Sequence, residues 1–182
     1  MAIKTFTTGE VLTASDTNTY LANSGLVYVK EQTVGNAVAS VTITNAFSTT
    51  FDDYRIIYVG GSSSASNDLA VTLGTTTAGY YFGSMYVAFT GVFNSIGVNN
   101  GASWTYAGCQ DTPNHLDCDI FSPFIARTST ISCAYVGTTT GRVIARGAGL
   151  LNNTTSYTDL KISAGSGTIT GGIVYVYGYR KA

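Results

Sequence analysis

The C-terminal segment 168–180 restricts the possible folds more than any other part of the chain. It is rich in β-branched and aromatic residues, contains no proline and carries a glycine pair before its apolar run, so it predicts a β-strand. Successive side chains of a strand point to opposite faces. One face therefore carries an isoleucine and tyrosines, namely Ile173, Tyr175, Tyr177 and Tyr179. The other carries Val174 and Val176, and neither face suits water, so we expect the strand to be covered on both sides.

A second segment, 54–59, repeats this composition. Its two faces are formed by Tyr54, Ile56 and Tyr58 on one side and by Ile57 and Val59 on the other. We expect both strands to lie centrally in one domain. Valines suit the core of that domain, and tyrosines suit a boundary where rings are buried while hydroxyls keep partners. The residues predicted at a contact between subunits are Tyr54, Tyr58, Tyr175, Tyr177 and Tyr179.

Beyond residue 25, short apolar or alternating stretches are separated by turn-forming residues. The clearest strands are predicted over 26–33, 38–44, 54–60, 69–74, 116–125, 129–137, 143–148 and 159–164. The most aromatic stretch is 80–93, and Asn99-Asn100-Gly101 favours a type I′ hairpin turn with a return strand over 104–107. Regular short strands without a convincing helix predict an all-β protein. We expect residues 26–182 to form an antiparallel β-sandwich that resembles a jelly roll.

Residues 1–25 differ from the rest and are predicted to form an arm with one short helix. Thr13, Ser15 or Asp16 can cap this helix, and Gly25 can end it. A helix of about two turns does not persist alone in water, so the arm must dock on its own domain or on another protein. The side chains predicted to anchor it are Val11, Leu12, Tyr20 and Leu21.

Charge and hydropathy exclude several classes of partner. A chain of 182 residues is long enough for one core-bearing domain. Only 10% of its residues are charged and its net charge is -1, so the chain lacks the excess of basic residues that binds nucleic acid. No apolar run approaches the ~18 residues of a membrane span, and the N-terminus has no apolar signal region. We therefore expect a protein made in the cytosol that neither binds nucleic acid nor inserts into a membrane.

Residues that would support catalysis or metal binding are sparse. His115 is the only histidine, no Gly-x-Ser-x-Gly elbow occurs, and no carboxylate pair is nominated by its spacing. Several metal-ligating residue types surround His115, but the tight Cys-x-x-Cys spacing of zinc sites is absent. Cys109, Cys118 and Cys133 are an odd set, best interpreted as reduced thiols. The sequence predicts no enzyme and no cofactor.

Carbohydrate binding is an alternative with some support in the sequence. Aromatic rings that lie on the surface beside asparagine and threonine can form a platform for sugars. The residues that would contribute are Tyr80, Tyr81 and Trp104. The competing interpretation places these rings in the core or in a contact between subunits.

Three stretches together resemble small structural proteins of tailed bacteriophages. Residues 6–21 (FTTGEVLTASDTNTYL) are similar to the leader of many phage fibre and appendage proteins. Residues 47–56 (FSTTFDDYRI) resemble a run found in the β-sandwich heads of such proteins. Residues 167–171 (GTITG) with 174–178 (VYVYG) complete the resemblance, which touches both ends and one central strand.

The resemblance implies a virion-surface protein, usually a homotrimer, with an N-terminal anchor and a C-terminal β-sandwich. Its partners would be its own copies and other capsid or tail proteins, after synthesis in the cytoplasm of a bacterial host. The chain has no room for a fibre shaft, which favours a compact capsid decoration knob over a tail fibre or tail tip. The alternative is a tail fibre module that binds a host receptor or surface glycan.

Overall fold

The computed structural model describes residues 7–16, 25–137 and 143–181, and almost all of its regular structure is β-strand. One helical turn, α1 (Ala14–Asp16), precedes the strands. In chain order the strands are β1 (Leu26–Thr33), β2 (Ser40–Ile43), β3 (Asp53–Gly60), β4 (Ser62–Ser63), β5 (Asn67–Leu73), β6 (Tyr80–Ala88), β7 (Phe93–Gly101), β8 (Trp104–Gln110), β9 (Asn114–Phe121), β10 (Ser129–Val136), β11 (Val143–Leu151), β12 (Leu160–Ala164), β13 (Ile169–Thr170) and β14 (Ile173–Tyr179). The predicted all-β class is confirmed.

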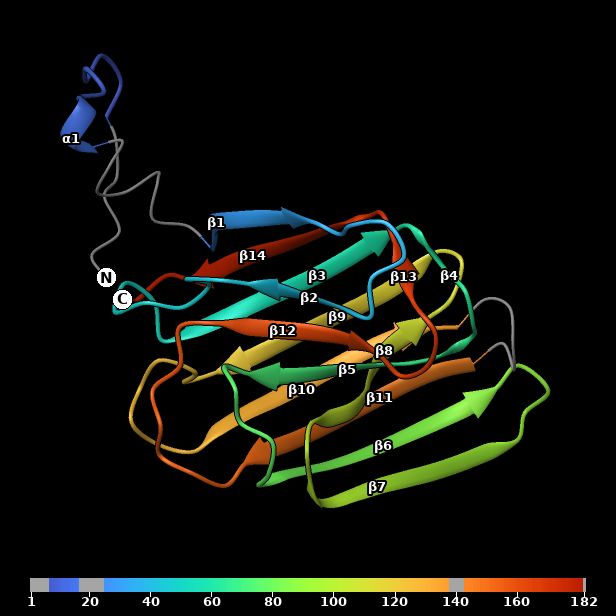
Figure 1. Ribbon diagram of the computed structural model, residues 1–182. Coiled ribbons are helices and arrows are strands. Elements are labelled where there is room, and N and C mark those ends of the chain that lie inside the picture. The colour runs from blue at the N-terminus through green and yellow to red at the C-terminus, as the bar shows by residue number, and fades with distance from the viewer. Residues whose placement is uncertain (1–6, 17–24, 138–142, 182) are drawn as a thin grey trace.

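Twelve of these strands form one antiparallel sheet that folds over into two layers (Figure 1). The small layer has the order β2-β12-β5-β8, and the large layer has the order β1-β14-β3-β9-β10-β11-β6-β7. The layers join where Cys109 of β8 pairs with His115 of β9. β4 and β13 form a separate two-stranded ribbon. We call the side of the large layer that faces away from the small layer the outer face.

β14 and β3 are central neighbours, as predicted, because β14 pairs with both β1 and β3 and β3 pairs with both β14 and β9. Val174 and Val176 are fully buried between the layers. Their cross-strand partners on β3 are Tyr58 and Ile56. Residues directly opposite each other in an antiparallel pair lie on the same face. The valines of β14 therefore share the core with the tyrosine face of β3.

The prediction that Tyr54 and Tyr58 lie in a subunit contact is wrong, because both side chains are completely buried within one protomer. The Tyr54 hydroxyl accepts from the Ser48 amide at 2.8 Å and donates to the Ser48 carbonyl at 3.0 Å. The Tyr58 hydroxyl donates to the Gly171 carbonyl at 2.9 Å. Backbone groups of Ser48 and of the distant Gly171 satisfy the two hydroxyls, so burial of these tyrosines in the core leaves neither hydroxyl without a partner.

The phage-like run at 47–56 has a packing role in this fold. The Phe47 and Phe51 rings meet the Tyr54 ring edge-on, with centroids 4.8 and 5.9 Å away. A Cβ atom at Gly178 of β14 would overlap the Phe51 ring, so glycine is needed there for close approach. The spacing of the aromatic residues in this run is therefore explained by the core.

The predicted hairpin at Asn99-Asn100-Gly101 is wrong. These residues end β7, which pairs with β6, whereas β8 pairs with β5 in the small layer. Asn100 does have a positive φ of 53°, and its side-chain oxygen accepts from the Gly79 amide at 3.0 Å. Asparagine before glycine favours positive φ, but it does not determine which strands pair. Here the chain leaves one layer and enters the other.

The helix cap predicted at Thr13 is present. The Asp16 amide donates to Thr13 Oγ1 and the Thr13 amide donates to Asp16 Oδ2, both at 3.1 Å, which is a reciprocal capping arrangement. Val11 and Leu12 are exposed, whereas Tyr20 and Leu21 lie outside the described residues. Within the described ranges no helix is long and apolar enough to span a membrane.

Candidate interaction face

The outer face of the large layer carries a concentration of exposed apolar side chains. In the described part of the chain, the large hydrophobic residues that are exposed outside residues 7–16 and the β6–β7 turn all lie on this face: Leu26, Tyr28, Val59, Met85, Phe93, Phe121, Val136, Ile144 and Leu150. The outward positions of β2 and β12 in the small layer are polar, namely Ser40, Thr42, Lys161 and Ser163. The outward surfaces of the two layers therefore differ in character.

One end of the outer face, on β1 and β14, forms a tyrosine zone of Tyr28, Tyr175, Tyr177 and Tyr179. The Tyr28 and Tyr177 rings meet edge-on at 6.1 Å between centroids, and the Tyr175 and Tyr177 rings lie 6.4 Å apart. The three tyrosines of β14 are partly exposed. The expectation that they lie at a boundary is compatible with this position, and their role in a subunit contact stays a prediction.

The middle of the outer face is a charged centre. Arg55 Nη2 lies 2.5 Å from Asp117 Oδ2, and Arg55 Nη1 lies 3.5 Å from Asp119 Oδ1. Tyr179 donates to Asp119 Oδ1 at 2.5 Å. Partial burial and this hydrogen bond raise the pKa of Tyr179, so its hydroxyl remains a donor at neutral pH. Ion pairs this exposed contribute about 0–1 kcal/mol each to the stability of the fold. Their main effect is to hold the Arg55, Asp117 and Asp119 side chains in fixed orientations.

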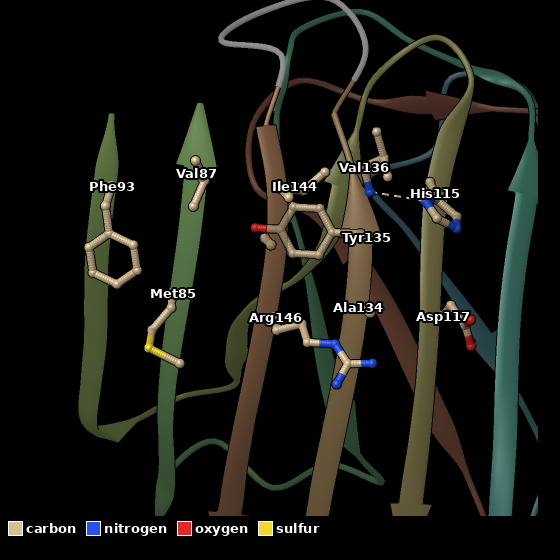
Figure 2. Close-up of a pocket in the computed structure, with 11 residues that line it drawn as sticks. Met85, Val87, Phe93, His115, Asp117, Ala134, Tyr135, Val136, Ile144 and Arg146 are labelled. Atoms are coloured by element: carbon tan, nitrogen blue, oxygen red, sulfur yellow. Dashed lines mark hydrogen bonds between the residues drawn. The ribbon is translucent and has the colours of Figure 1, made fainter. Parts of the chain in front are cut away.

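The opposite end of the outer face is a hollow of about 430 Å³, which we call the apolar end. Its apolar lining includes Met85, Val87, Phe93, Val136 and Ile144, which β6, β7, β10 and β11 bring together (Figure 2). On the side of the charged centre the hollow is bordered by His115, Asp117 and Arg146. The Val136 amide donates to His115 Nδ1 at 3.2 Å, which fixes the imidazole against β10 (Figure 2).

The predicted glycan platform is wrong for two of its three residues. Tyr80 and Trp104 are completely buried between the layers, where their rings meet edge-on at 5.2 Å. Trp104 Nε1 donates to the Leu150 carbonyl at 3.2 Å, and the Tyr80 hydroxyl accepts from the Leu73 amide at 2.8 Å. Large rings whose polar atoms find backbone partners suit a core. Only Tyr81, half-buried on the outer face opposite Leu150, reaches the surface.

The cysteines are free thiols, and Cys118 and Cys133 are directly opposite each other on β9 and β10. Burial raises the pKa of Cys133 to about 12 and that of Cys118 well above its ordinary value. Burial, with Asp111 nearby, also raises the pKa of Cys109 to about 12. Across residues 7–16, 25–137 and 143–181, no three His, Cys, Asp or Glu side chains are grouped as metal ligands.

Cys118 and Cys133 are therefore expected to resist alkylation in the folded protein. The thiolate is the reactive form, and a thiol of pKa about 12 is ionised in only about one molecule in ten thousand at pH 8. Iodoacetamide labelling followed by peptide mass spectrometry should be at least ~100-fold slower for these two residues than in urea-unfolded protein. Equal rates in folded and unfolded protein would show that the thiols are not enclosed.

The outer face contains candidate contact residues that were not predicted from the sequence, chiefly Met85, Phe93, Val136 and Ile144. The aromatic stretch 80–93 was the available signal, but its residues divide between core and surface. No family model matches the chain, and no curated protein sequence or solved structure shows significant similarity to it. Its class is an all-β protein whose outer sheet face carries exposed apolar residues around a charged centre.

Proposed function

We propose that this chain is a non-enzymatic structural protein on the surface of a bacteriophage virion. It forms an oligomeric knob, three-fold by the resemblance described above, that attaches to the particle through residues 1–25. We favour a capsid decoration or cement protein over a tail fibre or tail tip, because the described strands form a two-layered knob and not an elongated repeat. The outer face provides the contacts of the knob with protein partners.

The observation that carries this proposal is the one-sided distribution of exposed apolar residues. Phe93 and Met85 are 62% and 59% exposed, although both belong to paired strands of the large layer, Met85 to β6 and Phe93 to the edge strand β7. Soluble monomers seldom expose contiguous apolar patches of more than a few hundred Å², and larger ones mark interaction sites. A structural subunit requires an extended contact with other proteins. The outer face offers one, because its apolar, charged and aromatic regions lie on the same side of the molecule.

The N-terminal arm supports attachment to a second kind of partner. Val11 and Leu12 are 78% and 51% exposed beside the capped turn α1. Burial of these two side chains in a pocket of a neighbouring protein stabilises the contact by about 1.5–3 kcal/mol each. The conformational entropy lost when the arm becomes ordered offsets much of this free energy. A single arm therefore binds weakly, and several arms on one oligomer bind together with much higher avidity.

Deletion of residues 1–25 tests the attachment. The truncated protein should keep its oligomer mass and nearly its melting temperature, because the described part of the arm contributes no buried residue to the core. It should no longer co-sediment with the virus particles that carry the intact protein. The measurements are differential scanning calorimetry, light scattering and particle sedimentation.

A milder test of the attachment changes only the apolar side chains of the arm. Val11→Asp with Leu12→Asp should reduce particle binding as the deletion does, while Thr8→Asp in the exposed turn next to them should bind normally. If the truncated protein unfolded, or still coated particles fully, residues 1–25 would not be the anchor.

A glycan- or receptor-binding tail module is the second candidate, and the tyrosine zone beside the charged centre favours it. Exposed rings can stack on sugars, and Arg55, Asp117 and Asp119 offer the planar polar groups that bind hydroxyls. A glycan array probed with the intact protein and with Tyr177→Ala decides between the two functions. Binding that Tyr177→Ala removes would support the receptor function, and an array without a hit would leave the structural function favoured.

A further inference from the structure

β7 is an uncharged edge strand of the large layer. Among the described strands it pairs only with β6, and its nine residues include neither a charged residue nor a proline. The other edges carry recognised protection. β1 contains Lys30 and Glu31 and a register shift, and β2 is only four residues long. β7 also has a register shift, but it lies at the end of the strand, opposite Tyr80 and Phe82, and residues 93–98 pair regularly with β6. Natural proteins protect exposed edges with charges, prolines, shortness or irregular pairing, so we take this regular, uncharged stretch as one that a partner covers.

The apolar end lies directly beside this edge. Met85, Phe89, Val92, Phe93 and Ile144 are each at least 50% exposed, on β6, the β6–β7 turn, β7 and β11. Together they offer on the order of 500 Å² of apolar side-chain surface, taking aromatic rings as 150–250 Å² when fully exposed. A standard protein contact buries about 800 Å² on each partner, so this patch and the neighbouring edge are large enough to form most of one.

The chemistry of the patch fits a second copy of the chain. Near a rotation axis, identical side chains from different subunits meet each other, so charged groups there repel while apolar groups attract. The exposed apolar side chains of this patch and all residues of β7 are uncharged. On the side of the charged centre the hollow is also lined by Arg146 and Asp117, which have opposite charges, and Asp117 pairs with Arg55 within the protomer. A different virion protein would require no such self-compatibility.

We propose that copies of this chain meet through the apolar end and the edge strand β7, and not through the tyrosine zone. This inference rests on the proposed oligomeric knob and specifies which surface holds it together. It leaves the tyrosine zone and the N-terminal arm available for other partners.

The test is the mass of the full-length protein by light scattering across a dilution series, for the natural sequence and for single lysine variants. Phe93→Lys and Met85→Lys place like charges in the contact and should raise its dissociation constant about 100-fold or more. Both side chains are exposed, so circular dichroism and the melting temperature should remain close to those of the natural protein. Leu150→Lys, which is on the same face but outside the patch, should keep the oligomer mass and serves as the matched control.

Hydrogen exchange gives a second measurement that depends on the edge. Amides of β7 should exchange at least ~10-fold faster in Phe93→Lys than in the oligomer, while those of β14 should be unchanged. If the oligomer mass were unchanged in both lysine variants, the inference would be overturned and the proposed function would remain intact. A natural protein that is monomeric at every concentration would also overturn it, and particle sedimentation would then decide separately whether the chain is a virion protein.

Discussion

Val176→Asp is expected to abolish folding. Val176 is completely buried on β14, between β1 and β3, where its cross-strand partners are Lys30 and Ile56. A carboxylate at this position would lie between the two layers, where the ammonium of Lys30 is already bonded to the Thr44 carbonyl at 2.5 Å. Burying a carboxylate without a well-placed ion-pair partner costs several kcal/mol. That penalty is comparable with the whole stability of an ordinary domain, about 5–15 kcal/mol. We expect insoluble protein, or soluble protein without a cooperative thermal transition by circular dichroism.

Tyr175→Asp is the matched control, because it places the same side chain one residue away on the other face of the same strand. Tyr175 is partly exposed in the tyrosine zone, so the new carboxylate can remain hydrated. The variant should fold and lose no more than about 1–2 kcal/mol. A soluble, folded Val176→Asp protein with a melting temperature near that of the natural protein would show that the faces of β14 are assigned wrongly.

Trp104→Ala is expected to destabilise the protein by about 3–5 kcal/mol, the usual range for removing a buried tryptophan. The indole fills the space between the layers, packs edge-on against Tyr80 and donates to the Leu150 carbonyl. Its loss leaves a cavity and a buried carbonyl without its donor. At this chain length the melting temperature should fall by about 6–20 °C in differential scanning calorimetry.

Trp104→Phe separates the two contributions, because it keeps a ring beside Tyr80 and removes only the indole N–H and part of the volume. We expect it to cost about 1–3 kcal/mol. A residue of a surface sugar platform would respond differently, with loss of glycan binding and little change in stability. A melting temperature unaffected by Trp104→Ala would contradict the position of this side chain in the core.

The strands themselves follow from the amino-acid sequence. The stretch 26–33 was predicted with the bounds that β1 has, and the other predicted strands differ from the observed ones mostly at their ends. Alternation of side chains also placed Val174 and Val176 together on one face, and their apolar side chains favoured the core for it. The Thr13 cap is similarly local, since its partner Asp16 is three residues away. Strand alternation and helix capping depend on neighbours in the chain, which the sequence displays directly.

Alternation separates two faces of a strand but does not say which of them is buried. The tyrosines of β3 were therefore assigned to a subunit contact, although pairing with β14 places Tyr54 and Tyr58 on the same side as the valines. The turn at Asn99-Asn100-Gly101 was misassigned for a related reason. Its backbone conformation is local, but the partner of β7 is determined by the sheet as a whole.

The candidate face was decided by the tertiary structure alone. Met85, Phe93, Val136 and Ile144 come from four strands, and each is an ordinary apolar residue in its own stretch of sequence. They become one exposed patch because β10, β11, β6 and β7 lie side by side in the large layer, and β8 covers the inner face while nothing described covers the outer one. Conversely, Trp104 and Tyr80 resemble surface aromatics in the sequence, but Trp104 lies on β8 itself and packs against Tyr80 of β6, so both rings are buried between the layers. Burial depends on which distant segments pack against a face, and a local pattern cannot carry that information.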